Sequence, residues 1–336
     1  MREAGSLMKS GYVALVGRPN AGKSTLLNAL VETKVAIVSD KPQTTRTRIL
    51  GVKTTPKAQM VFVDTPGVHR PLHRLNVRMV DTALDALRSL DVVVVVVDAS
   101  ESTGKGTEFI LGLLEGVTQP VILALNKIDL VAKPALLPRM AWFQERFQFA
   151  DIVPIAARTG DGVAALEAVI DRHLPEGEPG FPEDYLTDQP ERRIAAELVR
   201  EQVLAATDDE LPFSTAVTID QFEEVATGRP TGRPKAGEEI AEPERDLLRI
   251  ACSILVDRAS QKPILIGKGG EMIKRIGTAA RLEIQKFFGT RVFLDLVVKV
   301  APEWRENERV LDDLGIAGTR RKGTARPGRR SAPRRR

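Results

Sequence analysis

Runs of consecutive apolar residues alternate along the first half of the chain with longer segments in which apolar positions recur every three or four residues. The clearest run is the six valines at 92–97, and shorter runs stand at 13–16 and 121–125. Uninterrupted apolar runs indicate strands buried on both faces, and the periodic segments indicate helices. This alternation predicts an α/β fold: a doubly wound, mostly parallel sheet that helices cover on both faces.

The same pattern gives the expected limits of each element. Strands are expected at 13–16, 49–54, 59–63, 92–97, 121–125 and 152–155, and helices from near residue 23 and at 76–90, 106–116, 134–148 and 162–173. A polar loop, residues 39–48, separates the first helix from the second strand. No window approaches the 18 uncharged apolar residues of a membrane-spanning helix.

The pattern changes after residue 173, where a segment with four prolines, 174–190, interrupts the periodicity and indicates a linker. Beyond it the sequence predicts an α+β module with a three-stranded sheet. Its expected helices are 191–206, 270–288 and 303–314, and its expected strands are 214–219, 247–256 and 291–300. The chain is therefore divided into a flexible N-terminus (1–8), a first domain (9–175), a linker (176–190), a second domain (191–316) and a disordered tail (317–336).

Charge and cysteine content narrow the class of protein. The net charge of +4 comes from the tail, because residues 320–336 hold nine Arg or Lys and no acid. A solvated tail and a tail that binds a polyanion are both compatible with this composition. Cys252 is the only cysteine, so no disulfide forms within the chain, and a reducing cytoplasm fits. The first ten residues lack the apolar stretch of a signal peptide.

A phosphate-binding loop is the strongest motif. G-R-P-N-A-G-K-S matches G-x-x-x-x-G-K-[ST] between a predicted strand and a predicted helix. Its residues are Gly17, Arg18, Pro19, Asn20, Ala21, Gly22, Lys23 and Ser24. Lys23 is expected to bridge the β- and γ-phosphates, and Ser24 to ligate Mg²⁺.

The base is expected to be guanine, because N-K-I-D follows the strand 121–125 at the edge of the sheet where ligands bind. Asp129 can accept two hydrogen bonds from guanine, whereas adenine would leave its carboxylate unpaired at a cost of about 1.5–3 kcal/mol. Asn126 is expected to contact the base and brace the phosphate loop, and Lys127 to cover the ring beside Ile128. The backbone of a later loop, at Ala156 and Ala157, is expected to contact the guanine oxygen.

The motif D-T-P-G, residues Asp64, Thr65, Pro66 and Gly67, supplies the third element of the nucleotide site. Asp64 is expected to hold Mg²⁺ through a water, and the Gly67 amide to contact the γ-phosphate. A threonine of the polar loop should complete the metal shell, and we favour Thr45 over Thr44. Val68 stands where Ras-type enzymes place a water-orienting Gln, and an aliphatic side chain cannot polarise water, which predicts slow intrinsic hydrolysis.

In the second domain, G-K-G-G is expected between a strand and a helix, as in the G-x-x-G loop of a KH fold that clamps about four nucleotides of a single strand. The expected RNA-binding residues are Gly267, Lys268, Gly269, Gly270, Lys274 and Arg275. A glycine-lined helix cap in a dimerisation module is the competing interpretation.

Together these motifs resemble the bacterial Era GTPase family, and F-P-E-D-Y in the linker is specific to that family. The resemblance implies a Ras-like G domain followed by a type II KH domain. It further implies a Mg²⁺-dependent GTPase that binds small-subunit ribosomal RNA near its 3′ end and assists 30S assembly and RNA maturation. A cytoplasmic monomer with weak peripheral association with the inner face of the cell membrane is expected.

Asn20 also resembles the asparagine of potassium-dependent GTPases, which helps to bind a monovalent cation; a turn-forming asparagine is the alternative. With Lys23, Thr45 and Gly67 it makes up the expected catalytic set. The chain departs from the family pattern at Ala156, in the long 227–244 loop and in the tail. A tRNA-modifying GTPase is disfavoured because the chain ends in arginines rather than a cysteine. A scaffold with a degenerate site is disfavoured because Lys23, Ser24 and Asp129 are present.

Overall fold

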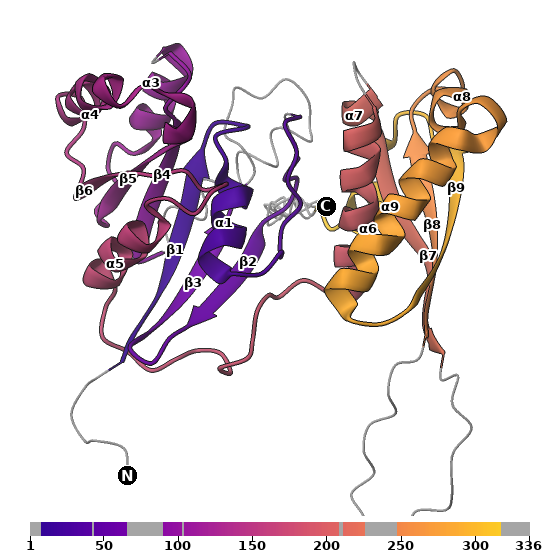
Figure 1. Cartoon of the computed structure of the whole chain (residues 1–336), viewed down its shortest axis with the longest axis horizontal. Coiled ribbons are helices and arrows are strands. Elements are labelled where there is room, and N and C mark those ends of the chain that lie inside the picture. Colours follow the sequence, from indigo (N-terminus) through magenta and orange to yellow (C-terminus); the bar gives the residue numbers. More distant parts are fainter. Residues whose placement is uncertain are drawn as a thin grey trace, which may run out of the picture.

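The structure is a computed structural model that describes residues 8–41, 44–65, 90–102, 104–207, 211–225 and 247–316. Two units lie side by side, each built on its own sheet, and residues 174–190 join them (Figure 1). The expected helix at 76–90, the 227–244 loop and the basic tail lie outside the described residues, apart from residue 90.

The N-terminal unit contains a six-stranded sheet in the order β2-β3-β1-β4-β5-β6. The strands are β1 Lys9–Gly17, β2 Ile49–Thr54, β3 Ala58–Asp64, β4 Val92–Asp98, β5 Val121–Asn126 and β6 Asp151–Pro154. Only the pairing of β2 with β3 is antiparallel; the other neighbouring strands are parallel. The carboxyl ends of β1, β3, β4 and β5 therefore lie on one edge of the sheet, where the sequence motifs follow them.

Successive strand residues pack on opposite faces of this sheet. Val13 and Leu15 pack under helices α1 (Lys23–Val31) and α5 (Val163–His173). Ala14 and Val16 pack in a second cluster with α3 (Lys105–Leu113) and α4 (Leu136–Gln144). This is the doubly wound α/β fold that the apolar runs predict.

One helix is shorter than expected. The predicted helix 134–148 is a 3₁₀ turn, η2 Lys133–Ala135, followed by α4, which ends at Gln144. The chain then leaves the helix, and its aromatic rings pack together. The Phe149 ring lies 6.3 Å from the Phe143 ring and 4.9 Å from the Phe147 ring, measured between ring centres. Burial of these rings offsets the lost helical hydrogen bonds.

The C-terminal unit is a three-stranded sheet, β7-β8-β9, with two long helices on one face. Its elements are α6 Glu191–Ala206, α7 Leu211–Ser214, β7 Thr215–Val225, β8 Leu247–Val256, α8 Gln261–Ile266, η3 Lys268–Gly270, α9 Glu271–Phe288, β9 Val292–Val300, η4 Trp304–Glu306 and α10 Glu308–Asp313. The apolar faces of α6 and α9 enclose Cys252, and burial raises the pKa of this thiol to about 12. A core role for Cys252 follows.

G-K-G-G does not directly follow a strand as expected: the predicted strand 247–256 is β8, but the short helix α8, residues 261–266, stands between it and the loop, so the loop joins two helices. The apolar run P-I-L-I belongs to no element expected from the sequence, and it adds no strand to the sheet, whose central strand β8 pairs with β7 and with β9. Of this run only Leu265 is buried in the core, and Pro263 stands in the first turn of α8, where its missing N–H costs nothing. Helix α7 was not predicted either.

The linker is attached to the N-terminal sheet rather than free. Val52 donates its N–H to the Leu186 carbonyl at 2.9 Å, and the Thr187 hydroxyl donates to the Leu50 carbonyl at 2.6 Å. The stacked rings of Phe181 and Tyr185, 4.8 Å apart, pack beside Leu50 and Val52. These contacts fix the point from which α6 departs.

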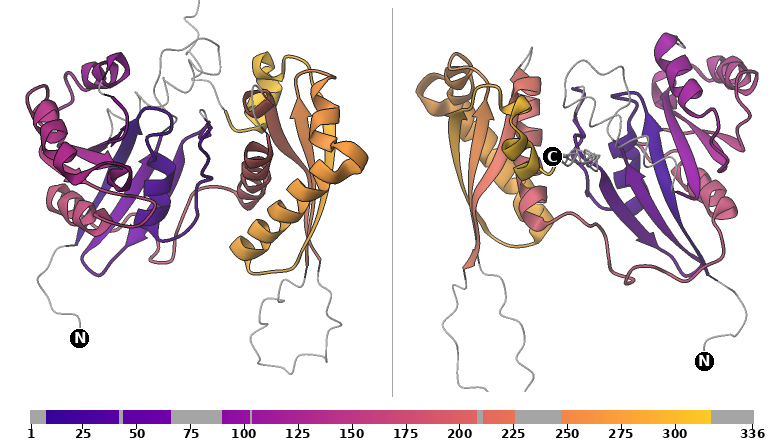
Figure 2. Two further views of the ribbon diagram at one scale, coloured as in Figure 1. Left: turned by 45° about the horizontal axis from the view of Figure 1, so that its top comes forward. Right: turned by 180° about the vertical axis from the view of Figure 1, so that it is seen from behind.

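Helix α6 lies on the side of the C-terminal unit that faces the N-terminal sheet, as the views of Figures 1 and 2 agree. Ile37, which precedes the polar loop, is buried in the same apolar cluster as Ile194 and Leu198 of α6. The two units therefore share a packed interface that includes the chain leading into the polar loop.

Candidate functional site

The phosphate loop, residues 17–24, turns tightly between β1 and α1. Asn20 and Gly22 have left-handed backbone angles, with φ of 63° and 94°. A Cβ atom on Gly22 would lie 2.2 Å from Nδ2 of Asn126, and one on Gly17 would lie 2.3 Å from the Val96 carbonyl. Glycine is therefore required at both positions, and the turn that results presents backbone N–H groups at the start of a helix, as anion sites do.

Lys23 is curled inside this loop. Its Nζ donates to the carbonyls of Gly17 and Arg18 at 3.2 and 3.0 Å. Burial lowers the pKa of the Lys23 ammonium, and the negative charge of Asp64 opposes that shift. The charged group is thus held where phosphates bind in such loops.

Three oxygen-bearing side chains meet beside Lys23. The Ser24 hydroxyl donates to Oδ2 of Asp64 at 2.7 Å and lies 2.7 Å from the Thr45 hydroxyl oxygen. Burial raises the pKa of Asp64 to about 6 against the opposing effects of Lys23, Ser24 and Thr45. Among the described residues, the buried Oδ1 of Asp64 has no hydrogen-bond partner.

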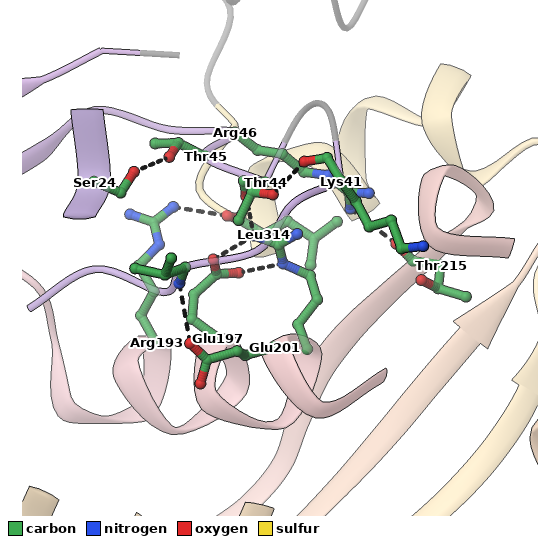
Figure 3. Close-up of polar contacts among 12 residues, drawn as sticks. Ser24, Lys41, Thr44, Thr45, Arg46, Arg193, Glu197, Glu201, Thr215 and Leu314 are labelled. Atoms are coloured by element: carbon green, nitrogen blue, oxygen red, sulfur yellow. Dashed lines mark hydrogen bonds and ion pairs between the residues drawn. The ribbon is translucent and has the colours of Figure 1, made fainter. Parts of the chain in front are cut away.

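This oxygen set fits Mg²⁺. Octahedral ligands at about 2.0–2.1 Å from the metal lie roughly 3 Å apart, close to the spacing of the Ser24 and Thr45 hydroxyls. A bound cation would also supply a positive counter-charge next to the buried Asp64 carboxylate. The neighbouring Thr44 is turned differently, because its hydroxyl donates to the Lys41 carbonyl at 2.6 Å (Figure 3).

The base-reading motif lies at the end of β5. Asn126 donates from Nδ2 to the Ala21 carbonyl at 2.8 Å and accepts at Oδ1 from the Ala157 N–H at 3.0 Å. One side chain thus ties the phosphate loop to the loop at Ala156 and Ala157. Asp129 forms an ion pair with Arg158 at 2.9 Å.

Sequence reasoning missed the partner of Lys127. Asp98 ends β4, pairs in register with Asn126, and holds Nζ of Lys127 at 2.6 Å. Burial disfavours the charged form, but hydrogen bonds from Lys127 and Ser100 outweigh it and keep the pKa of Asp98 below its usual value. Its position at the carboxyl end of the neighbouring strand was a signal that could have identified it.

These groups line one cleft of about 540 Å³. Its lining includes Pro19, Asn20, Gly22, Lys23, Ser24, Thr45, Asn126, Lys127, Asp129 and Ala157 of the predicted residues, together with Ile37, Val38 and Arg158, which were not predicted. Residues that the sequence predicts to contact phosphate, metal and base thus meet in a single space large enough for a nucleotide.

Other predicted residues support the cleft from behind or lie elsewhere. Thr65 is buried and donates to the Leu15 carbonyl at 2.9 Å, and Arg18 pairs with Glu101 at 2.5 Å. Gly17, Ala21, Asp64, Ile128 and Ala156 adjoin the cleft without being among its lining residues. Pro66, Gly67 and Val68 lie outside the described residues.

A second candidate site borders helix α9 in the C-terminal unit. Lys268 and Gly269 are exposed, and Gly269 and Gly270 have left-handed φ values of 60° and 83° with open space where a Cβ would stand. A groove of about 300 Å³ runs between α9 and β9. It is lined by Ile273, Lys274, Gly277, Thr278, Arg281, Leu294 and Leu296.

Of the six residues predicted to bind RNA, Lys274 lines this groove, and the G-K-G-G loop and Arg275 do not. Arg281 lines the groove although it was not predicted; its spacing of seven residues from Lys274, two helical turns, was the available signal. Arg275 was predicted but is not among the lining residues, and its guanidinium instead contacts the Met272 sulfur at 3.0 Å.

Comparison with known proteins gives matches along most of the chain. A family model described as a 50S ribosome-binding GTPase matches residues 12–127, and a KH domain model matches residues 235–305. The GTPase Era proteins of Geobacter metallireducens and Geotalea uraniireducens are each 48% identical over 307 residues, which is 91% of this chain and 97% of each relative.

Two solved structures are similar over both units. One is Era in complex with MgGDPNP and nucleotides 1506–1542 of 16S ribosomal RNA, with 40% identity, a TM-score of 0.84, and coverage of 92% of this chain and 99% of that one. The other is an Aquifex aeolicus Era variant bound to GDP·AlF₄⁻, with 40% identity, a TM-score of 0.83, and coverage of 92% and 100%. The similarity thus extends from the nucleotide cleft through the groove of the second unit.

Proposed function

This chain belongs to the Era family of GTPases, and from that premise we propose that it is a GTP-hydrolysing switch. We further propose that it binds single-stranded ribosomal RNA near the 3′ end of the small-subunit RNA and assists assembly of the 30S subunit. The observation that carries the proposal is the cleft in which Lys23, the Ser24–Thr45 hydroxyl pair and Asp129 meet. Each group contacts a different part of a guanine nucleotide.

In this assignment Lys23 holds the β- and γ-phosphates, and Ser24 and Thr45 are the side-chain ligands of Mg²⁺, with Asp64 acting through a water. Bound Mg²⁺ neutralises negative charge on the phosphates. Asp129 selects guanine, and the Lys127 stem, held by Asp98, covers the ring. Asn126 keeps the base-reading and phosphate-binding loops in register.

Asn20 is assigned a role in binding K⁺. The left-handed Asn20 donates from its amide nitrogen to the Asp40 carbonyl at 2.5 Å, so its side chain lies between the phosphate loop and the polar loop. Carbonyl oxygens, such as that of the Asn20 amide, are ligands that hard cations prefer. A monovalent cation there would place positive charge at the phosphates, which would compensate for the absence of a water-orienting Gln at Val68. The Gly67 amide is proposed to contact the γ-phosphate.

The RNA is proposed to lie in the groove between α9 and β9, beside G-K-G-G. Lys274 and Arg281 supply cations, and Gly277 and the open glycines of the loop allow the nucleic-acid backbone to approach closely. The related Era complex contains nucleotides 1506–1542 of 16S ribosomal RNA, which supports a 3′-end sequence as the target.

In the cell we propose a cytoplasmic monomer with weak peripheral association with the inner face of the membrane. None of the helices in the described part of the chain has the length and apolar character needed to cross a bilayer. The basic residues of the tail offer an electrostatic route to anionic lipids.

The proposal is tested by two assays on the full chain. Phosphate release from GTP should require Mg²⁺ and should be abolished by Lys23→Ala, with Lys9→Ala as a matched lysine control outside the cleft. Crosslinking to total cellular RNA and sequencing of the bound fragments should recover the 3′ end of the small-subunit RNA. Absence of hydrolysis by the wild type, or recovery of RNA without preference for that region, would contradict the respective half of the proposal.

A further inference from the structure

The polar loop is held by the C-terminal unit on both sides of Thr45. A guanidinium nitrogen of Arg200, on α6, donates to the Thr44 carbonyl, which belongs to the peptide group that leads into Thr45. On the other side, Nη1 of Arg46 donates to the Thr215 carbonyl at 2.8 Å. Figure 3 shows Arg46 reaching Thr215 of the C-terminal unit while the Thr45 hydroxyl meets Ser24.

Both arginines are buried at this contact. Arg200 is 2% exposed and Arg46 is 7% exposed. The Arg46 guanidinium lies 5.4 Å from the ring centre of Trp304, whose indole N–H donates to the Ser214 carbonyl at 2.9 Å. The loop is therefore anchored in a dry, packed environment, where a hydrogen bond restricts geometry more than it does at an exposed surface.

One carboxylate offsets part of the positive charge at this contact. Burial and the nearby Arg200 lower the pKa of Arg46 to about 9. Glu197 pairs with Arg200 at 2.6 Å, and although burial opposes its ionisation, Arg200, Arg46 and Arg193 hold its pKa below the usual range. Two cations are thus brought together next to Thr45, with Glu197 as their counter-charge.

The same helix also holds the start of the loop. Glu201 accepts the Val38 N–H at 3.0 Å and pairs with Lys34 at 2.7 Å. Lys34 also pairs with Glu283 of α9 at 2.7 Å, which provides an interdomain contact that does not touch the peptide groups beside Thr45. Helix α6 therefore contacts the chain at Val38 and again at Thr44.

We propose that Arg200 is a positioning residue for GTP hydrolysis: by holding the Thr44 carbonyl, the KH domain keeps the Thr45 hydroxyl beside Ser24 at the metal site. The proposal rests on the assignment of Thr45 to Mg²⁺ above. A ligand at about 2.0–2.1 Å tolerates little displacement. Without the contacts of Thr44 and Arg46, the backbone at Thr45 is free to rotate and to carry the Thr45 hydroxyl away from Ser24.

The experiment measures the Mg²⁺ concentration that gives half-maximal binding of the nonhydrolysable analogue GDPNP. It also measures the Mg²⁺ concentration that gives half-maximal GTP hydrolysis, with kcat and KM at saturating Mg²⁺. The main variant is the pair Arg200→Met with Glu197→Gln, which removes the anchor together with the carboxylate paired with it. Because this pair also removes the counter-charge of Arg46, the single variant Arg200→Met, which keeps Glu197, is measured beside it. Arg46→Met removes the second anchor without altering the KH domain. Arg200→Lys retains one donor, and Glu283→Gln breaks an interdomain ion pair away from Thr45. Thermal unfolding verifies that each variant is folded.

We expect the double variant and Arg46→Met each to raise the half-maximal Mg²⁺ concentration about tenfold, the loss typical of an outer-shell partner of a metal ligand. At saturating Mg²⁺ the KM for GTP should stay within about twofold of the wild type, because the base and phosphate contacts are retained. Arg200→Lys should recover most of the loss, and Glu283→Gln should behave as the wild type.

Three results would overturn the proposal. An unchanged Mg²⁺ dependence in both anchor variants, while Thr45→Val shifts it, would refute the positioning role but leave the metal site intact. An equal shift in Glu283→Gln would mean that domain docking in general, rather than the Thr44 contact, sets the metal site. If Thr45→Val did not shift the Mg²⁺ dependence, the metal role of Thr45 would be refuted, and with it the positioning role of Arg200. A wild-type protein that is inactive with GTP at any Mg²⁺ concentration would refute the proposed function itself.

Discussion

Oδ2 of Asp98 lies 2.6 Å from Nζ of Lys127, and the two residues come from the carboxyl ends of neighbouring parallel strands. Lys127 has a left-handed φ of 62°, so its backbone is conformationally restricted while its side chain is paired with Asp98. Asp98 also accepts the N–H and the hydroxyl of Ser100, at 2.8 and 2.6 Å. A nearly buried carboxylate thus sets the direction of the side chain that is proposed to cover guanine.

Asp98→Asn should weaken nucleotide binding and alter the pH dependence of stability. Loss of the charge-assisted bond should raise the Kd for GDP about threefold to tenfold and lower the stability by about 1–2 kcal/mol. Because the pKa of Asp98 is lowered in the folded state, its contribution is fully present above the unfolded value of about 3.9 and is lost as the pH falls through the folded value.

The measurement is thermal unfolding of both proteins, with nucleotide titration at neutral pH. The difference between wild type and variant should be constant from pH 8 to 5 and should shrink only as the pH approaches the acid limit. Asp151→Asn, which also breaks ion pairs but at the start of β6, should leave GDP affinity unchanged. A stability difference that changes between pH 8 and 6 would contradict the assigned direction of the shift.

Asp129→Asn should change the preferred base from guanine to xanthine, because the side chain then offers one acceptor and one donor in place of two acceptors. Loss of the paired acceptors should cost about 1.5–3 kcal/mol with GTP, roughly 10- to 100-fold in affinity. Arg158→Gln removes the ion pair of Asp129 while leaving its acceptors intact, so it should retain the preference for GTP. Competition between GTP and xanthosine triphosphate is the assay; a GTP-preferring Asp129→Asn protein would show that the residue does not read the base.

Hydrolysis should be faster in K⁺ than in Na⁺ at equal ionic strength if Asn20 helps to bind a monovalent cation. Asn20→Ala should remove the difference, but alanine also disfavours the left-handed φ of 63°. Asn20→Gly accommodates that angle while removing the amide, so it separates the two interpretations. Stimulation by K⁺ that survives in Asn20→Gly would assign Asn20 to turn formation.

The nucleotide motifs could be identified from sequence because local geometry dictates their residues. At Gly22 a left-handed turn and the approach of Asn126 exclude any Cβ, so the glycine spacing itself encodes the loop. The apolar strand runs fix which polar residues come to the same sheet edge, and this placed Asn126 and Asp129 near Lys23. Asp98 obeys the same rule and was predictable in principle.

Other features depend on contacts distant in sequence. The backbone on either side of Thr45 is held in an irregular loop by contacts of Thr44 with Arg200 and of Arg46 with Thr215, partners that lie more than 150 residues away. No periodicity in residues 39–48 encodes such contacts. Likewise α8 was not predicted, because its apolar run is too short for periodicity to distinguish a helix from a strand.

Two basic features of the chain should divide RNA binding between them. The G-K-G-G loop and the adjoining groove should provide selectivity, so the pair Lys268→Asp with Gly269→Asp should abolish preference for the 3′-end RNA over a scrambled sequence. Aspartate tolerates a left-handed φ better than most residues, and a Cβ at Gly269 meets no atom within 4 Å, so the fold should survive. The added negative charge stands where phosphate must approach.

The tail should instead supply nonselective attraction. Residues 317–336 contain nine Arg or Lys without an aromatic residue. Their deletion should reduce the dependence of binding on salt, because each cation that contacts a single strand contributes about −0.7 to the slope of log K against log salt. It should also lower total affinity while leaving the preference for cognate RNA intact.

A salt titration of both variants against cognate and scrambled RNA distinguishes these contributions. Hydrolysis of GTP without RNA serves as the common control, since neither change lies in the G domain and neither should alter it. If deletion of the tail removed selectivity, or if the aspartate pair retained it, the proposed division between a selective G-K-G-G loop and a nonselective tail would be wrong. Survival of selectivity in the aspartate pair, joined with its loss in Arg281→Ala, would move recognition from the loop to the groove itself, because Arg281 lines that groove without belonging to G-K-G-G.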